Sequence, residues 1–233
     1  MMVVMNDNAR RGPEWRRLVA EFFVPRLGGD RTAWETANRD VFEDLFKNFV
    51  DPGPGDMDYV SWIEEYQKRW LRGMAEAAGV QFSSDDAYCL KLSYEATAYV
   101  TRRVHAEYPG AVEAVHSLHN YGFQLFTASN ELSGELNGYL TGMGVRQYFG
   151  TLYGSDILNQ GKYSTEYYRR MFEHAGVDSE NSLVVDDNQQ NLAWASALGA
   201  ATCLVGASAQ QTGRPTFTVS SLSELPAALV KTV

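Results

Sequence analysis

Short apolar runs alternate with polar stretches in the second half of the chain. Three of these runs end in polar or glycine residues and have the composition of buried strands. They are "FQLFTAS" (123–129), "SLVVD" (182–186) and "ATCLV" (201–205). Runs of this length and apolarity are typical of strands that are buried on both faces of a sheet.

Helical patterns separate the predicted strands. Apolar residues recur every three or four positions in two segments, which predicts two amphipathic helices. The stripes consist of Val112, Val115 and Leu118 in the first helix, and of Tyr168, Met171, Phe172 and Ala175 in the second. Gly122 is a candidate stop for the first helix. Alternation of strands and helices predicts an α/β fold, with a parallel sheet covered by helices on both faces.

The region from residue 15 to residue 104 has a different pattern. It consists of long amphipathic segments without strand alternation, and the loop "DPGPGD" (51–56) separates two of them. We therefore predict a helical domain over 15–104, inserted into an α/β domain made of 1–14 and 105–233. The opening run "MMVVM" is the predicted first strand of that α/β domain.

Composition and charge argue against several classes of protein. The net charge of −9 argues against a nucleic-acid-binding protein, which would carry a basic face. Cys89 and Cys203 are isolated in the sequence, which favours free thiols in a reducing compartment. We find neither a signal-peptide pattern nor an apolar stretch long enough to span a membrane. We expect a cytoplasmic protein; its oligomeric state cannot be read from the sequence.

Polar residues with phosphate-binding chemistry follow the predicted strands. Ligands of parallel sheets bind at the carboxyl ends of strands, and "TASN" (127–130) stands at such an end. A hydroxyl and backbone N–H groups there could hold a phosphate oxygen, although such residues are more often turns or helix caps. Lys162, before a helix with Ser164 as predicted N-cap, could neutralise a phosphate or simply be solvated.

The pair Asp186 and Asp187 directly follows a predicted buried strand. Adjacent carboxylates are costly there unless they bind a cation or find hydrogen-bond donors. Oxygen ligands at an open strand end suit Mg²⁺, which takes one or two carboxylates and keeps several waters. The alternative is that one of the two aspartates only caps the helix that follows.

Together, "FTASN", "GKYS" and "VVDDNQQNLAWASALGA" resemble the second, third and fourth motifs of the haloacid dehalogenase-like hydrolase superfamily. The resemblance implies a Rossmann-like core with an inserted helical cap. It also implies attack by an aspartate on phosphorus, an aspartyl-phosphate intermediate, and Mg²⁺ as cofactor. The implied phosphate-binding residues are Thr127, Ser129, Asn130 and Lys162, of which Ser129 and Lys162 are also catalytic. The implied metal ligands are Asp7, Asp186 and Asp187.

The first motif of that superfamily, Asp-x-Asp-Gly-Thr, is replaced here by "MNDNARRG". If Asp7 is the nucleophile, Ala9 stands at the position of the acid–base. If Asn6 and Asn8 take the two aspartate positions, both carboxylates have become amides. If Asp7 is the second aspartate, Met5 takes the place of the nucleophile. We favour Asp7 as the catalytic nucleophile, and another possibility is that part of the native first strand is omitted or replaced.

The leading hypothesis is a Mg²⁺-dependent phosphatase that acts on a small phosphorylated metabolite, impaired by its altered first motif. Loss of a positioned acid–base would slow the reaction by a factor on the order of 10² to 10⁴. The first alternative is an inactive protein that uses the same fold for binding or regulation. Further alternatives are a 2-haloacid dehalogenase and a phosphonatase, in which a lysine of the helical domain, Lys47 or Lys68, would form a Schiff base.

Overall fold

A computed structural model describes residues 2–49, 58–82, 85–206 and 215–230. Its contacts divide the chain into two compact units. The sheet unit consists of Met1–Asn8, Ala106–Leu136 and Met143–Val233, and the helical unit of Ala9–His105 and Asn137–Gly142. The predicted domain boundaries, after residues 14 and 104, remain a prediction, and the predicted loop 51–56 lies outside the described residues.

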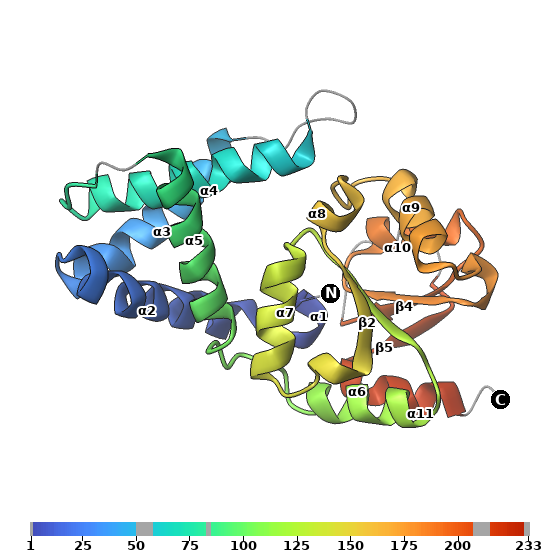
Figure 1. Ribbon diagram of the computed structural model, residues 1–233. Helices are drawn as coiled ribbons and strands as arrows, with labels where there is room; N and C mark the ends of the chain where they lie inside the picture. Colours follow the sequence, from blue (N-terminus) through green and yellow to red (C-terminus); the bar gives the residue numbers. More distant parts are fainter. Residues whose placement is uncertain (1, 50–57, 83–84, 207–214, 231–233) are drawn as a thin grey trace. The chain divides into compact units, whose positions relative to one another are not determined.

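The described residues of the sheet unit form five strands, all paired in parallel (Figure 1). Strands β1 (Leu125–Ala128) and β2 (Phe149–Tyr153) form a two-stranded sheet. A three-stranded sheet has the order β3-β4-β5, with β3 at Leu183–Asp186, β4 at Ala201–Val205 and β5 at Phe217–Val219. The three strands predicted downstream of residue 120 are confirmed as β1, β3 and β4. Strands β2 and β5 were not predicted, because they are short runs interrupted by glycine, threonine or polar residues.

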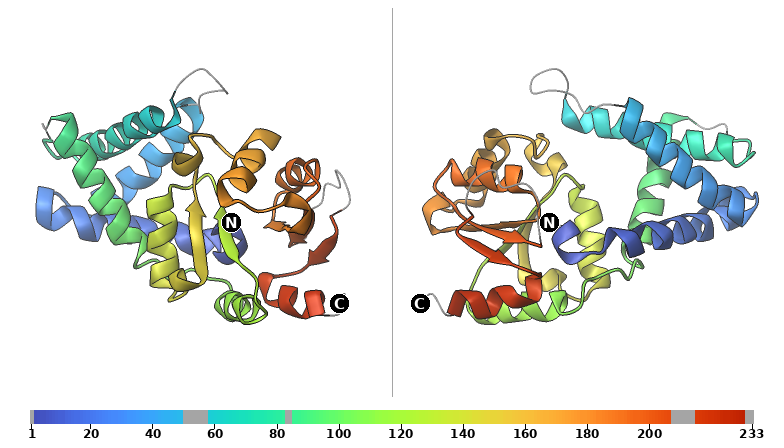
Figure 2. Two further views of the ribbon diagram at one scale, coloured as in Figure 1. Left: turned by 45° about the vertical axis from the view of Figure 1, so that its right-hand side comes forward. Right: turned by 180° about the vertical axis from the view of Figure 1, so that it is seen from behind.

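Helices pack on these strands and confirm the α/β fold class. Figures 1 and 2 show α9 and α10 on one side of the strands of this unit, and α6 and α11 on the other. The helices of the segment from residue 106 onward are α6 (Ala111–Asn120), α7 (Ser133–Gly142), α8 (Ser155–Leu158), α9 (Thr165–Ala175), α10 (Gln189–Ser196) and α11 (Leu225–Val230). Helix α6 stops where predicted, since Gly122 has a φ of +89° that favours glycine.

The prediction that "MMVVM" forms the first strand is wrong. Residues Met2–Met5 form a short helix, α1, and only Asn6 makes a β-type bridge, antiparallel to Glu107. The carbonyl of Met5 accepts from the N–H of Tyr108 at 2.8 Å, and the N–H of Asp7 donates to Ala106 at 2.8 Å. A four-residue apolar run fits a helical turn as well as a strand, so tertiary pairing decides between them.

Over residues 9–49, 58–82 and 85–105, the helical unit contains four long helices: α2 (Asn8–Leu27), α3 (Arg31–Asn48), α4 (Tyr59–Ala77) and α5 (Asp86–Thr101). Helices α3, α4 and α5 each begin after an aspartate whose carboxylate accepts a backbone N–H of the first turn. The core is aromatic: the rings of Phe23 and Trp34 are stacked with their centroids 4.9 Å apart. No helix among the described residues is long and apolar enough to cross a membrane.

Both cysteines are buried free thiols. Burial raises the pKa of Cys89 above its ordinary value and that of Cys203 to about 11. Because the thiolate is the reactive form, we expect neither thiol to react with Ellman's reagent in the native protein at pH 8. Both should react in denaturant, and absorbance at 412 nm measures the difference. Rapid reaction of a native thiol would contradict this burial.

Candidate functional site

The ends of β1 and β3 are joined through the side chain of Lys162. Its ammonium donates to a carboxylate oxygen of Asp186 at 2.7 Å and to the carbonyl oxygen of Ala128 at 3.0 Å. Lys162 is 5% exposed and Asp186 2%. A buried ion pair of this kind is stabilised by further hydrogen bonds, such as the one that Lys162 donates to Ala128.

The second carboxylate oxygen of Asp186 also accepts hydrogen bonds. It accepts the backbone N–H of Asn188 at 2.8 Å and the side-chain amide of Asn191 at 3.0 Å. Burial alone would raise the pKa of Asp186, but the adjacent Lys162 ammonium and the N–H of Asn188 hold that pKa below its ordinary value. Asp186 is therefore a carboxylate with both oxygens hydrogen-bonded.

The segment after β1 lies against the same lysine. The side-chain oxygen of Asn130 accepts the backbone N–H of Lys162 at 2.5 Å, and the hydroxyl of Ser129 accepts the N–H of Glu131 at 3.1 Å. Thr127 is fully buried, and within the described chain its hydroxyl has no hydrogen-bond partner. Ser129, Asn130, Lys162 and Asp186 are thus brought together.

Asp187 lies next to this group but is exposed. Although Asp187 stays exposed, its carboxyl group loses part of its hydration. This loss and the neighbouring Asp186 carboxylate raise the pKa of Asp187 above its ordinary value. Neither aspartate caps helix α10: the cap is Asn188, whose side-chain oxygen accepts from the N–H of Gln190 at 2.8 Å and of Asn191 at 3.4 Å. The capping alternative for the two aspartates is therefore wrong.

Asp7 lies in the connection between α1 and α2 and is half-buried. It belongs to the same compact unit as the residues above. Its neighbour Asn6 is completely buried, and neither polar atom of the Asn6 side chain has a hydrogen-bond partner among the described residues. A buried amide usually has hydrogen-bond partners, because burying it without any costs a few kcal/mol.

The predicted Mg²⁺ site stays a prediction. In the described ranges, no three side chains of histidine, cysteine, aspartate or glutamate form a group that could hold a metal ion. A Mg²⁺ ion that takes one or two carboxylates and keeps several waters does not need such a group, so Asp7, Asp186 and Asp187 remain the predicted ligands. Asp186 has Lys162 as its counter-ion, and the next residue, Asp187, is exposed.

The two lysines considered for a Schiff base lie in the helical unit and form ion pairs. Lys47 is 3.9 Å from Glu43, and Lys68 lies 3.0 Å from Glu65 and 3.1 Å from Asp86. The hydrogen bonds that Lys68 donates to the carboxylates of Glu65 and Asp86 raise its pKa. Since a Schiff-base lysine reacts as the neutral amine, this environment disfavours that role for Lys68.

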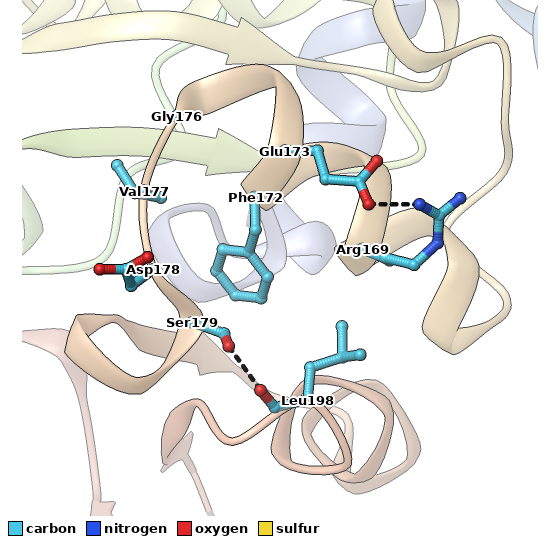
Figure 3. Close-up of a pocket in the computed structure, with 8 residues that line it drawn as sticks. All are labelled: Arg169, Phe172, Glu173, Gly176, Val177, Asp178, Ser179 and Leu198. Atoms are coloured by element: carbon cyan, nitrogen blue, oxygen red, sulfur yellow. Dashed lines mark hydrogen bonds and ion pairs between the residues drawn. The ribbon is translucent and has the colours of Figure 1, made fainter.

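A separate pocket of about 430 Å³ lies beside α9 and shares no residue with this group (Figure 3). Phe172, Val177 and Leu198 supply its apolar lining, and Arg169 pairs with Glu173 on its wall. The hydroxyl of Ser179 donates to the carbonyl of Leu198 there.

Sequence reasoning missed Tyr167, whose hydroxyl contacts the backbone of Ser129. In the sequence, Tyr167 is one of two adjacent tyrosines beside an apolar stripe. Nothing in the helical pattern distinguishes a tyrosine that binds a distant loop from one that only fills the core.

Residues 39–205 match the family of haloacid dehalogenase-like hydrolases. A phosphoglycolate phosphatase from Rhodospirillum rubrum is 29% identical over 92 residues, which are 40% of this chain and 38% of that relative. The chain thus matches well under half the length of this curated relative. The family match begins downstream of Asp7, so it does not include the altered first motif.

Solved structures with the same fold are similar over nearly the whole chain. The defluorinating L-2-haloacid dehalogenase Rha0230 has a TM-score of 0.64 at 17% identity, covering 94% of this chain and 91% of its own. The HAD-hydrolase YfnB from Bacillus subtilis, solved with magnesium bound, has a TM-score of 0.57 at 18% identity, covering 97% and 93%. Together with the family match, these results show that the chain belongs to the haloacid dehalogenase-like hydrolases, with their Rossmann-like α/β fold.

Proposed function

We propose that the protein hydrolyses the phosphate monoester of a small metabolite in the cytoplasm, at the group formed by Ser129, Asn130, Lys162 and Asp186. The observation that carries the proposal is the position of Lys162. Its ammonium has three N–H donors, and within the described chain two of them are used by Ala128 and Asp186. The third is available for a phosphate oxygen in a buried setting, where a charged hydrogen bond is strong.

Asp7 is the proposed nucleophile, as the one carboxylate of "MNDN". Its oxygen would form a bond to phosphorus while the bond between phosphorus and the leaving oxygen breaks. The leaving oxygen takes its proton from water, because Ala9 stands at the position of the acid–base. Water then hydrolyses the aspartyl-phosphate and regenerates the carboxylate. Similarity to a phosphoglycolate phosphatase supports a phosphate substrate.

A second candidate is a protein that binds anions without hydrolysing them. The structure of the N-terminal segment favours it, because Met2–Met5 is helical and the buried Asn6 amide is unpaired among the described residues. In this case Lys162 and Ser129 would still hold a phosphate, while the segment around Asp7 would not reach it.

Hydrolysis of p-nitrophenyl phosphate distinguishes these candidates. The assay compares wild type with Asp7→Asn and Asp187→Asn, each with 5 mM Mg²⁺ and with EDTA, and with exposed Asp40→Asn as control. Turnover that is lost in Asp7→Asn and kept in Asp40→Asn supports the hydrolase. Loss with EDTA and in Asp187→Asn would support the Mg²⁺ dependence expected from the sequence.

Absence of turnover over a panel of phosphate esters, with inorganic phosphate still bound in calorimetry, would favour the anion-binding protein. Release of chloride from 2-chloropropionate without metal would overturn both candidates in favour of a dehalogenase. Absence of phosphate binding and of both activities would reject the proposed site itself.

A further inference from the structure

The hydroxyl of Tyr167 contacts the ends of both β1 and β2. Tyr167 lies in α9 and is completely buried. Its hydroxyl oxygen accepts the backbone N–H of Ser129 at 3.0 Å, and it lies 3.2 Å from the carbonyl oxygen of Ser129 and 3.1 Å from that of Tyr153. A hydroxyl has one proton, so it donates to one of these two carbonyls at a time.

Ser129 is the residue that this contact fixes. Its N–H is shared between the Tyr167 hydroxyl and the carbonyl of Tyr153, which lies at 3.1 Å. The Ser129 side chain accepts the N–H of Glu131 at 3.1 Å, which closes the turn after β1. Helix α9 therefore contacts both backbone polar groups of Ser129, while the backbone N–H of Glu131, two residues along the chain, donates to its side chain.

We infer that Tyr167 is a positioning residue: its hydroxyl sets the backbone of Ser129 in the orientation needed to bind an oxyanion. The inference rests on the proposed function in one respect, that Ser129 binds the phosphate. In this inference Tyr167 does not bind the phosphate itself but acts through Ser129. Without the hydroxyl, the Ser129 turn loses a buried partner, and the turn samples other orientations.

The adjacent residue supplies a matched control. Tyr168 is also completely buried in α9, and the two rings meet edge to face with centroids 5.4 Å apart. Within the described residues, however, the Tyr168 hydroxyl has no hydrogen-bond partner. Tyr167→Phe and Tyr168→Phe therefore remove the same atom from the same helix, but only the first removes contacts with Ser129.

A second control separates lost stability from lost positioning. Ser179→Ala removes one hydrogen bond from a hydroxyl to a backbone carbonyl, that of Leu198, in the same compact unit (Figure 3). No residue of the proposed phosphate site (Ser129, Asn130, Lys162 and Asp186) takes part in this hydrogen bond. If loss of one hydrogen bond anywhere in this unit weakened anion binding, Ser179→Ala would do so as well.

The test measures amide hydrogen exchange at Ser129 by NMR, and binding of inorganic phosphate by calorimetry, in wild type and the three variants. We expect exchange at Ser129 to accelerate about tenfold in Tyr167→Phe, the effect of one lost hydrogen bond of about 1.4 kcal/mol. Phosphate affinity should fall by about the same factor. Tyr168→Phe and Ser179→Ala should stay within about twofold of wild type in both measurements.

Equal exchange at Ser129 in Tyr167→Phe and Tyr168→Phe would overturn the inference, as would accelerated exchange with unchanged phosphate affinity. Wild-type protein that binds no phosphate would instead overturn the proposed function. In that case the exchange at Ser129 alone decides whether Tyr167 orients the turn. The two failures are therefore distinguishable.

Discussion

Replacing Lys162 by methionine is expected to lower the free energy of unfolding by about 3–5 kcal/mol, the usual cost of removing one partner of a buried ion pair. Methionine keeps the length of the side chain but leaves the Asp186 carboxylate, 2% exposed, without its cation. It also leaves the carbonyl of Ala128 without the donor at 3.0 Å. Urea unfolding followed by circular dichroism measures the change, and phosphate binding should be lost as well.

Two further variants test the cause of that loss. Lys162→Met combined with Asp186→Asn removes both charges, so part of the stability should return relative to Lys162→Met alone. Lys47→Met removes a lysine that is 69% exposed and weakly paired with Glu43, and it should change stability by less than about 0.5 kcal/mol. Equal effects of the Lys47 and Lys162 changes would show that the buried pair contributes no special stability.

The α/β fold could be predicted from the sequence because buried strands leave a strong local signal. The runs that form β1, β3 and β4 are apolar throughout, and their flanking residues mark their ends. The first predicted strand failed for a related reason. The four residues of α1 are too few for a period to show, and their conformation depends on the antiparallel pairing of Met5 and Asp7 with Ala106 and Tyr108.

The candidate site was predictable only in part. Ser129, Asn130, Lys162 and Asp186 were identified because each follows a strand or precedes a helix, and parallel topology brings such positions to one edge. The partner of Asp186 could not be predicted, since its carboxylate is satisfied by Lys162, 24 residues earlier in the chain. A carboxylate pair in sequence therefore suggested a metal, whereas in the structure an ammonium is the counter-ion of Asp186.

Replacing Gly154 by alanine is expected to cost about 3 kcal/mol of stability, as overpacking against fixed atoms does. The added Cβ would lie 2.4 Å from the carbonyl oxygen of Glu131, 2.6 Å from the N atom of Ser133 and 2.6 Å from a carboxylate oxygen of Asp156. Two of these are backbone atoms, which cannot rotate away. The φ of Gly154 is −94°, so its backbone conformation itself would accept alanine.

Gly154→Ala should also weaken phosphate binding at the site. Gly154 precedes Ser155, whose hydroxyl donates to the carbonyl of Asn130 at 3.1 Å. Moving the Gly154 backbone away from Glu131 would shift Asn130 and, with it, the N–H of Lys162 that Asn130 accepts. Gly134→Ala is the control: a Cβ there has no heavy atom within 4 Å, and alanine favours the helix, so stability should be unchanged or rise by up to about 1 kcal/mol. Thermal unfolding and phosphate calorimetry of both variants give the comparison. A Gly154→Ala protein as stable as Gly134→Ala would show that the loop after β2 can move without affecting the end of β1.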